Sequence, residues 1–145
     1  MAILPFLTFL YLCNMKAVND IRDEADVEQL INRFYEKVVV DPVIGYIFTE
    51  VAKTDFARHL AVMYGFWKFL LLNASDTYQG NPMHKHVELH EKHPLKAVHF
   101  DRWVALFEET VDELFAGPGS ENAKFRAMSI AETWKYKFDS PFSAS

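Results

Sequence analysis

Cysteine is nearly absent from this chain of 145 residues, in which Cys13 is the only one. A single cysteine excludes an internal disulfide and a metal site built from several thiolates. It fits a reducing cytoplasm, where we expect the protein to be located. Basic residues are outnumbered by acidic ones, 15 to 20, which gives a net charge of −5. Because nucleic-acid binding needs a basic surface, we expect no nucleic-acid partner.

The chain also has no hydrophobic run of the roughly 20 residues that a membrane span requires. Residues 1–13 are almost wholly apolar and uncharged, but they lack the basic start of a secretory signal. We therefore expect no stable membrane insertion. The segment could be a short apolar arm, a degenerate anchor or translated upstream sequence, and the amphipathic pattern just beyond Met15 favours the last of these.

No stretch of useful length alternates apolar and polar residues, so strands are not expected. Apolar residues recur instead at helical spacing, which predicts an all-α fold. The predicted helices are residues 23–40, 55–72, 82–90, 100–115 and 120–138, with a short turn or single helical turn over 42–48. We expect Thr54, Asn81 and Ser120 to cap the helices that follow them. In the last helix, the residues predicted to face inward are Phe125, Met128, Ala131, Trp134 and Phe138.

Aromatic residues make up 15% of the chain, and thirteen of them are Phe. This share suits the lining of a pocket for a flat apolar ligand, although a Phe-rich core explains it equally well.

Histidine is the residue type that most suggests chemistry, because four of the six histidines lie within ten residues. His86 and His90 could share a divalent metal, since residues four apart lie on one helical face, but no cysteine or suitably placed carboxylate completes such a site. Alternatively, most of them are exposed, which is our expectation for His84, His90, His93 and His99. A third interpretation is that His86, flanked by Met83, Val87 and Leu89, ligates the iron of a haem.

A gas-binding haem protein needs polar hydrogens opposite its iron ligand. Tyr35, His59 and Trp103 supply them from three different predicted helices. Each has a structural alternative, because a tyrosine, histidine or tryptophan on an apolar face is often only a core residue. Their combination with His86 favours the haem interpretation.

The order of five blocks resembles the truncated globins, specifically their group III. The resemblance covers about residues 20–138. It rests on residues 34–38 (FYEKV), 41–48 (DPVIGYIF), 58–67 (RHLAVMYGFW), 78–89 (YQGNPMHKHVEL) and 100–111 (FDRWVALFEETV). Residues 1–14 have no recognised counterpart. The resemblance implies a globin domain over 18–140, an extension over 1–17 and a frayed tail over 141–145.

The resemblance also implies a fold and a set of roles. The fold would be a two-over-two helical sandwich that encloses a haem b. His86 would be the proximal iron ligand, and Tyr35, His59 and Trp103 would form the distal pocket. Four further residues would contact or adjoin the haem: Phe34, Phe48, Met63 and Met83. Arg58 and Lys85 are candidates for the haem edge by position alone.

Two function classes follow from this resemblance. The first is a monomeric globin that reversibly binds O2, NO and CO, for oxygen transport or sensing. The second is a haem enzyme for NO dioxygenation or peroxide chemistry. That enzyme would need a separate reductase, because the chain has no glycine-rich dinucleotide loop. A helical interaction module without haem remains a third class.

Overall fold

The helical periodicity of the sequence becomes helical structure throughout the computed structural model, which describes residues 18–75 and 77–139. In this part of the chain there is no strand. The elements are α2 (Glu24–Val39), the π-helix η1 (Ile47–Val51), α3 (Phe56–Leu72), α4 (Pro82–Lys92), α5 (Ala97–Leu114) and α6 (Pro118–Phe138). None of these helices is long and apolar enough to cross a membrane. The predicted N-terminal extension and C-terminal tail lie outside the described residues.

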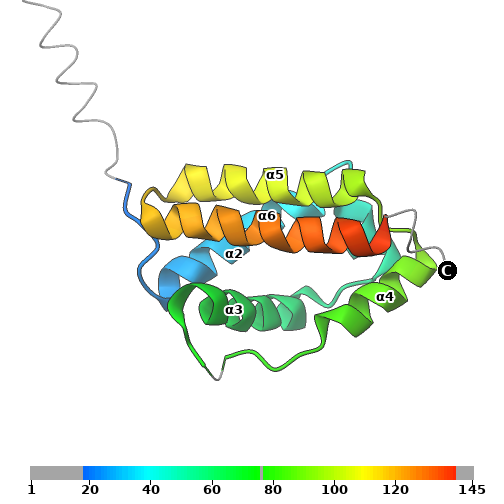
Figure 1. Ribbon diagram of the computed structural model, residues 1–145, viewed down its shortest axis with the longest axis horizontal. Helices are drawn as coiled ribbons and strands as arrows, with labels where there is room; N and C mark the ends of the chain where they lie inside the picture. Colours follow the sequence, from blue (N-terminus) through cyan, green and yellow to red (C-terminus); the bar gives the residue numbers. More distant parts are fainter. Residues whose placement is uncertain (1–17, 76, 140–145) are drawn as a thin grey trace, which may run out of the picture.

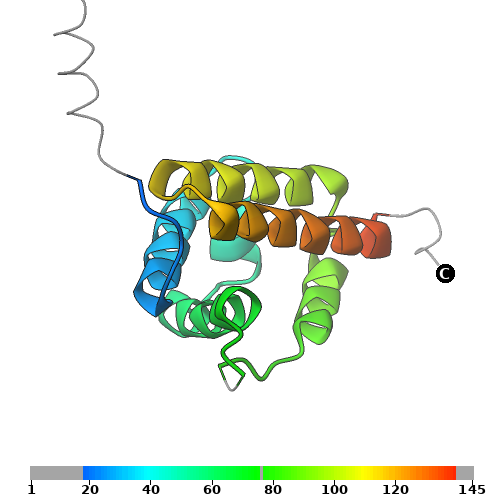
Figure 2. The ribbon, with the colours of Figure 1, turned by 60° about the vertical axis from the view of Figure 1, so that its left-hand side comes forward.

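The four long helices form two layers, as Figure 1 shows. α5 lies along α6 in one layer, and α2 packs against α3 in the other, with further contacts from α2 to α5 and from α3 to α6. This is the predicted two-over-two sandwich. The short helix α4 stands apart from the two pairs in Figure 2, at the end of a long connection from α3. α4 therefore lies beside the two layers and belongs to neither of them.

The core lies between α2 and the central parts of α3 and α5. One stripe of α2 is completely buried, because its apolar residues recur every three or four positions. Its members are Val27, Leu30, Ile31, Phe34 and Val38. Trp67 of α3 stacks on Phe107 of α5 with ring centroids 4.5 Å apart. This stack joins the two layers directly.

Two of the three predicted caps are wrong, and the structure gives a reason for each. α3 begins one residue later than expected, because the Asp55 carboxylate, not Thr54, accepts the hydrogen bond from the free Arg58 N–H. α6 begins at Pro118, two residues before the position predicted from Ser120. Gly117 precedes it with a φ of 140°, a conformation that only glycine adopts easily.

The start of α6 is capped by Asp20, a residue close to the N-terminal end of the described chain. Asp20 accepts hydrogen bonds of 2.8 Å from the backbone N–H groups of Gly119 and Ser120, and one of 2.7 Å from the Ser120 hydroxyl. Asp20 and Ser120 are 100 positions apart, so no local sequence pattern could reveal this cap. The N-terminal end of the described chain is thereby fixed to the α5–α6 layer.

The inward face of α6 also differs from the prediction. Phe125 and Met128 are 59% and 43% exposed, whereas Ala123, Ala127 and Ala131 are buried. The small side chains let α6 approach α5 closely, so the core selects alanine over the larger apolar residues here. α5 likewise begins at Ala97, three residues earlier than predicted, and Asp139 accepts the 2.7 Å hydrogen bond from its first backbone N–H.

The turn after α2 depends on a buried carboxylate. The Asp41 side chain is only 2% exposed and accepts a 2.8 Å hydrogen bond from Arg102 Nε, and Arg102 Nη2 forms an ion pair with the same oxygen at 2.7 Å. Its other oxygen accepts from the backbone of Val43 and Ile44. Burial by itself would raise the pKa of Asp41, but these hydrogen bonds outweigh it and lower the pKa below its usual value.

We expect Asp41→Asn to lower the free energy of unfolding by roughly 2–3 kcal/mol at pH 7, because a charge-assisted pair becomes a neutral contact. The pKa of Asp41 is lower in the folded protein than in the unfolded chain, so ionised Asp41 stabilises the fold above the unfolded pKa of about 4. This stabilisation is lost as the pH falls through the folded pKa. The difference between variant and wild type should therefore shrink in acid. Urea unfolding at pH 7 and pH 3.5 measures both effects.

The matched control is Asp101→Asn, which removes the exposed partner of Lys135. Exposed ion pairs contribute up to about 1 kcal/mol, so this variant should unfold nearly as the wild type does. Equal losses in the two variants would contradict a special role for Asp41.

Candidate functional site

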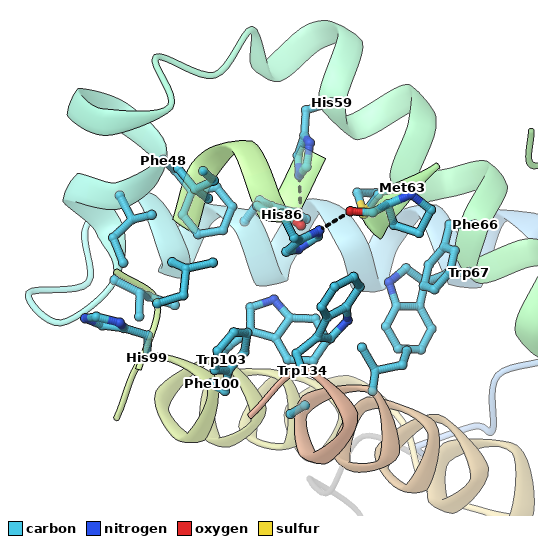
Figure 3. Close-up of a pocket in the computed structure, with 18 of the residues that line it drawn as sticks. Phe48, His59, Met63, Phe66, Trp67, His86, His99, Phe100, Trp103 and Trp134 are labelled. Carbon is cyan, nitrogen blue, oxygen red and sulfur yellow. Dashed lines mark hydrogen bonds between the residues drawn. The ribbon is translucent and has the colours of Figure 1, made fainter. Parts of the chain in front are cut away.

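A cavity of about 360 Å³ opens between α3, α4 and the α5–α6 layer, with walls that are almost entirely apolar. Its size lies in the range of ordinary small-molecule pockets. Figure 3 shows His59, His86 and Trp103 pointing into this space. The lining residues are Tyr35, Ile44, Ile47, Phe48, His59, Met63, Phe66, Trp67, Tyr78, Pro82, His86, Leu89, Leu95, His99, Phe100, Trp103, Ile130, Ala131 and Trp134.

His86 reaches the cavity from the second turn of α4. Asn81 caps this helix by accepting a hydrogen bond from the His84 N–H, and Pro82 occupies its first turn, as predicted. His86 Nδ1 lies 2.6 Å from the Pro82 carbonyl oxygen (Figure 3). A carbonyl only accepts, so Nδ1 must carry the proton, and Nε2 keeps a free electron pair.

The environment of His86 keeps its ring neutral. Burial lowers the pKa of His86, and it outweighs the Pro82 hydrogen bond, which raises the pKa. The neutral imidazole is the form that binds metal ions. A hydrogen-bonded Nδ1 with an unprotonated Nε2 is also the usual arrangement of a metal-ligating histidine.

Tyr35 and His59 form a hydrogen-bonded pair on the opposite wall. The Tyr35 hydroxyl lies 2.9 Å from His59 Nε2, and both side chains pack edge-on against Phe48. Burial raises the pKa of the Tyr35 hydroxyl, so it keeps its proton throughout the neutral range. Burial also lowers the pKa of His59, and the nearby positive charge of Lys85 lowers it further.

Trp103 places an indole in the same wall from α5. Its ring packs edge-on against Phe34 at 5.7 Å and stacks on Phe107 at 5.8 Å. Among the described residues its Nε1 has no hydrogen-bond partner, so this N–H is available to a ligand. The four residues predicted to carry the chemistry, from four helices, thus share one cavity.

The other predicted contact residues divide into two groups. Phe48 and Met63 line the cavity. Phe34 lies behind that wall, where its ring packs against Tyr35 and Trp103, and Met83 is half-buried on α4 outside the lining. Lys85 is close enough to His59 to affect its pKa, whereas Arg58 is an exposed residue of α3.

Sequence reasoning missed two aromatic residues of the site. Trp134 of α6 was expected only to face inward, but its ring stacks on His86 with centroids 4.3 Å apart. Tyr78 lies in the connection between α3 and α4, outside every predicted helix, but its ring lines the cavity and packs on Phe66. That loop is pinned to α3, because the Thr77 hydroxyl donates to the carbonyl of Gly65 at 2.8 Å.

Gly65 explains why this loop lies so close to the helix. A β-carbon at Gly65 would be 1.9 Å from the Thr77 carbonyl oxygen, so no larger residue fits there without moving the loop. A glycine inside a helix is the signal in the sequence that could have revealed this close approach.

The expectation that most of the remaining histidines are exposed is wrong for three of them. His84 is exposed and pairs with Glu88. His90 Nδ1 accepts the Leu95 N–H, His93 Nε2 lies 3.0 Å from the Tyr46 hydroxyl, and His99 lines the cavity. No group of three metal-binding side chains occurs in the described ranges, so the divalent-metal interpretation gains no support.

The fold and the cavity define the class of protein. The family model described as "Bacterial-like globin" matches residues 18–136, so the chain belongs to the globins, and its cofactor is haem. Within that class it is a group III truncated globin. It is 32% identical over 122 residues to the group 3 truncated hemoglobin ctb of Campylobacter jejuni, covering 80% of this chain and 93% of the relative.

A solved structure supports the same assignment. The structure of the group III truncated hemoglobin from Campylobacter jejuni matches with a TM-score of 0.70 and 28% identity, over 81% of this chain and 92% of that one.

The residues of the cavity fit a haem. The group needs a broad apolar slot and one neutral imidazole with a free nitrogen. The aromatic walls supply the slot, and the Pro82 carbonyl fixes the tautomer of His86 that leaves Nε2 free. His59 is the other histidine that reaches deep into the slot, but its Nε2 is engaged with Tyr35.

Proposed function

We propose that this globin, as a monomer, reversibly binds O2 and other diatomic gases at a haem b held by His86. The observation that carries the proposal is the arrangement of His86, whose Nε2 is free while Nδ1 is bound to the Pro82 carbonyl. The polar pair of Tyr35 and His59 lines the same cavity. One wall would hold the iron, and the other would bind the gas.

The haem held by His86 would supply an iron that binds O2, NO or CO. Tyr35 and Trp103 would each direct one polar hydrogen at a ligand there, in a cavity whose apolar walls exclude competing water. Phe48 and Met63 would pack against the flat faces of the macrocycle. Burial keeps the Tyr35 hydroxyl protonated, so its capacity to donate does not vary near pH 7.

His59 determines which way the Tyr35 hydrogen points. If His59 Nε2 accepts, the hydroxyl is committed to His59, and if Nε2 carries the proton, the hydroxyl is free to donate into the cavity. We propose that a bound ligand favours the second tautomer, so that His59 and Tyr35 act as one unit.

The absorption spectrum of the purified, haem-supplied protein tests this proposal. We expect a five-coordinate ferrous form that CO converts to a histidine-ligated carbonyl form. A six-coordinate ferrous form would mean that His59 or another side chain competes for the open position. Failure to take up haem at one equivalent per chain would contradict the proposal.

Three polar side chains around the cavity also suit an enzyme for NO dioxygenation or peroxide chemistry, with electrons from a separate reductase. Repeated conversion of NO to nitrate by the O2-loaded protein with a supplied reductant would favour this alternative. A single conversion per chain would favour gas binding.

A further inference from the structure

α4 carries the proposed iron ligand, yet it is weakly embedded in the fold. None of its residues is fully buried. Two histidine rings on one side of the helix make its aromatic contacts with α6. His86 stacks on Trp134 at 4.3 Å, and His90 packs on Phe138 at 4.9 Å. The position of α4 therefore depends on the aromatic side chains of α6 that contact these two histidines.

The last two turns of α6 present a rigid platform. The rings of Trp134 and Phe138 are parallel to within 1° at 5.4 Å, and Phe138 is nearly parallel to Phe100 of α5. Lys135 pairs with Asp101 at 2.7 Å, and Asp139 accepts a 2.7 Å hydrogen bond from the backbone N–H of Ala97. These two contacts join the end of α6, just beyond Trp134, to the start of α5.

The hydrogen bond to Pro82 cannot by itself orient His86. It fixes the position of Nδ1, but the ring can still tilt about that atom. The Trp134 indole lies 22° from parallel to the imidazole, so it restricts the tilt from the face of the ring. Aliphatic neighbours such as Ile130 fill space beside the cavity without defining a plane.

We propose that Trp134 is a positioning residue that sets the ring plane of His86, and through it the direction of Nε2. This inference rests on the proposed function, in which His86 ligates iron. Trp134 would act without touching the gas, because it restricts the orientations in which the His86 ring can bind the iron.

The test uses full-length holoprotein and two substitutions of Trp134. Trp134→Leu removes the flat ring, whereas Trp134→Phe keeps it. Phe125→Leu is the matched control, because Phe125 is an exposed aromatic residue of the same helix. The readouts are the iron–histidine stretching band of the ferrous protein by resonance Raman spectroscopy, and the rate of haem transfer to an excess of acceptor apoprotein.

We expect Trp134→Leu to shift or broaden the stretching band and to speed haem transfer by about twofold to tenfold, the range that an aromatic pair contributes. Trp134→Phe should keep a stretching band and a rate of haem transfer close to those of the wild type, and Phe125→Leu should match the wild type in both. A wild-type band and rate in Trp134→Leu would overturn the role of Trp134 while leaving the proposed function intact. Absence of the band from the wild type, or its survival in His86→Gly, would instead overturn both.

A second substitution covers the case in which Trp134→Leu fails to fold, as judged by helical circular dichroism. Phe138→Leu removes the ring that supports Trp134 and leaves the Trp134–His86 pair in place. It should broaden the band to a smaller extent than Trp134→Leu. An unchanged band in a folded Phe138→Leu variant would contradict a rigid platform.

Discussion

Replacing His86 with glycine should abolish stoichiometric haem binding. Loss of a hydrogen-bonded partner behind a metal ligand already weakens affinity by about 10- to 100-fold, so loss of the ligand itself should cost more than about 100-fold. The apolar walls would still attract the macrocycle, but neither of the next two histidines along the chain could replace His86. His90 faces Phe138, and His93 is bound to Tyr46. Titration of the apoprotein with haem, followed by absorption, measures the loss.

The same variant allows a rescue experiment. Glycine leaves a space beside Trp134 and below the Pro82 carbonyl, and free imidazole can enter it and use the same acceptor. Millimolar imidazole should therefore restore a histidine-like spectrum. His84→Gly is the control, because His84 is exposed, two residues away and paired only with Glu88. Haem loss in His84→Gly, or normal uptake in His86→Gly, would mean that the ligand is misassigned.

Local sequence patterns predicted the helices because a helix is stabilised by residues three and four apart. The buried stripe of α2 is continuous in the sequence, and so are the Asn81 cap and Pro82 at the start of α4. These signals predicted α2 and the start of α4 to within one residue. They also predicted that Tyr35, His59, His86 and Trp103 would point inward, since each lies on the apolar side of its own helix.

Long-range contacts could not be predicted in the same way. The cap of α6 comes from Asp20, 100 residues earlier. Trp134 stacks on His86, 48 positions away, although the periodicity of α6 shows only that Trp134 faces inward. The prediction that Phe125 and Met128 lie in the core is wrong because hydrophobicity alone does not determine burial, and α6 instead buries Ala123, Ala127 and Ala131.

The histidines illustrate the same limit. Their spacing could not separate a ligand from a structural residue, because His86 and His90 share a helical face. The difference lies in their partners, since the Nδ1 of His86 faces a carbonyl and the Nδ1 of His90 accepts an N–H. A carbonyl requires the protonated nitrogen and an N–H requires the unprotonated one, so the two rings have opposite tautomers. Only a structure supplies that information.

The hydrogen-bonded pair of Tyr35 and His59 gives the second prediction with a large effect. We expect the Tyr35→Phe variant to release O2 faster than the wild type. A hydrogen bond to a ligand that gains negative charge on binding contributes roughly 1.5–3 kcal/mol, which corresponds to about a 10- to 100-fold increase in the dissociation rate when it is lost. The side chain is buried and keeps its proton, so phenylalanine removes the hydroxyl and little else. Stopped-flow displacement of O2 by CO measures the rate.

Tyr46→Phe is the matched control, since it also deletes a hydroxyl bound to a histidine ring, at 3.0 Å from His93 Nε2, but outside the cavity lining. It should leave O2 release unchanged. CO gains less negative charge than O2, so its dissociation should change less in Tyr35→Phe than that of O2. If both gases were released faster by the same factor, Tyr35 would act by shaping the cavity. If neither rate changed, the ligand would be held by Trp103 or His59, and Tyr35 would serve only to orient His59.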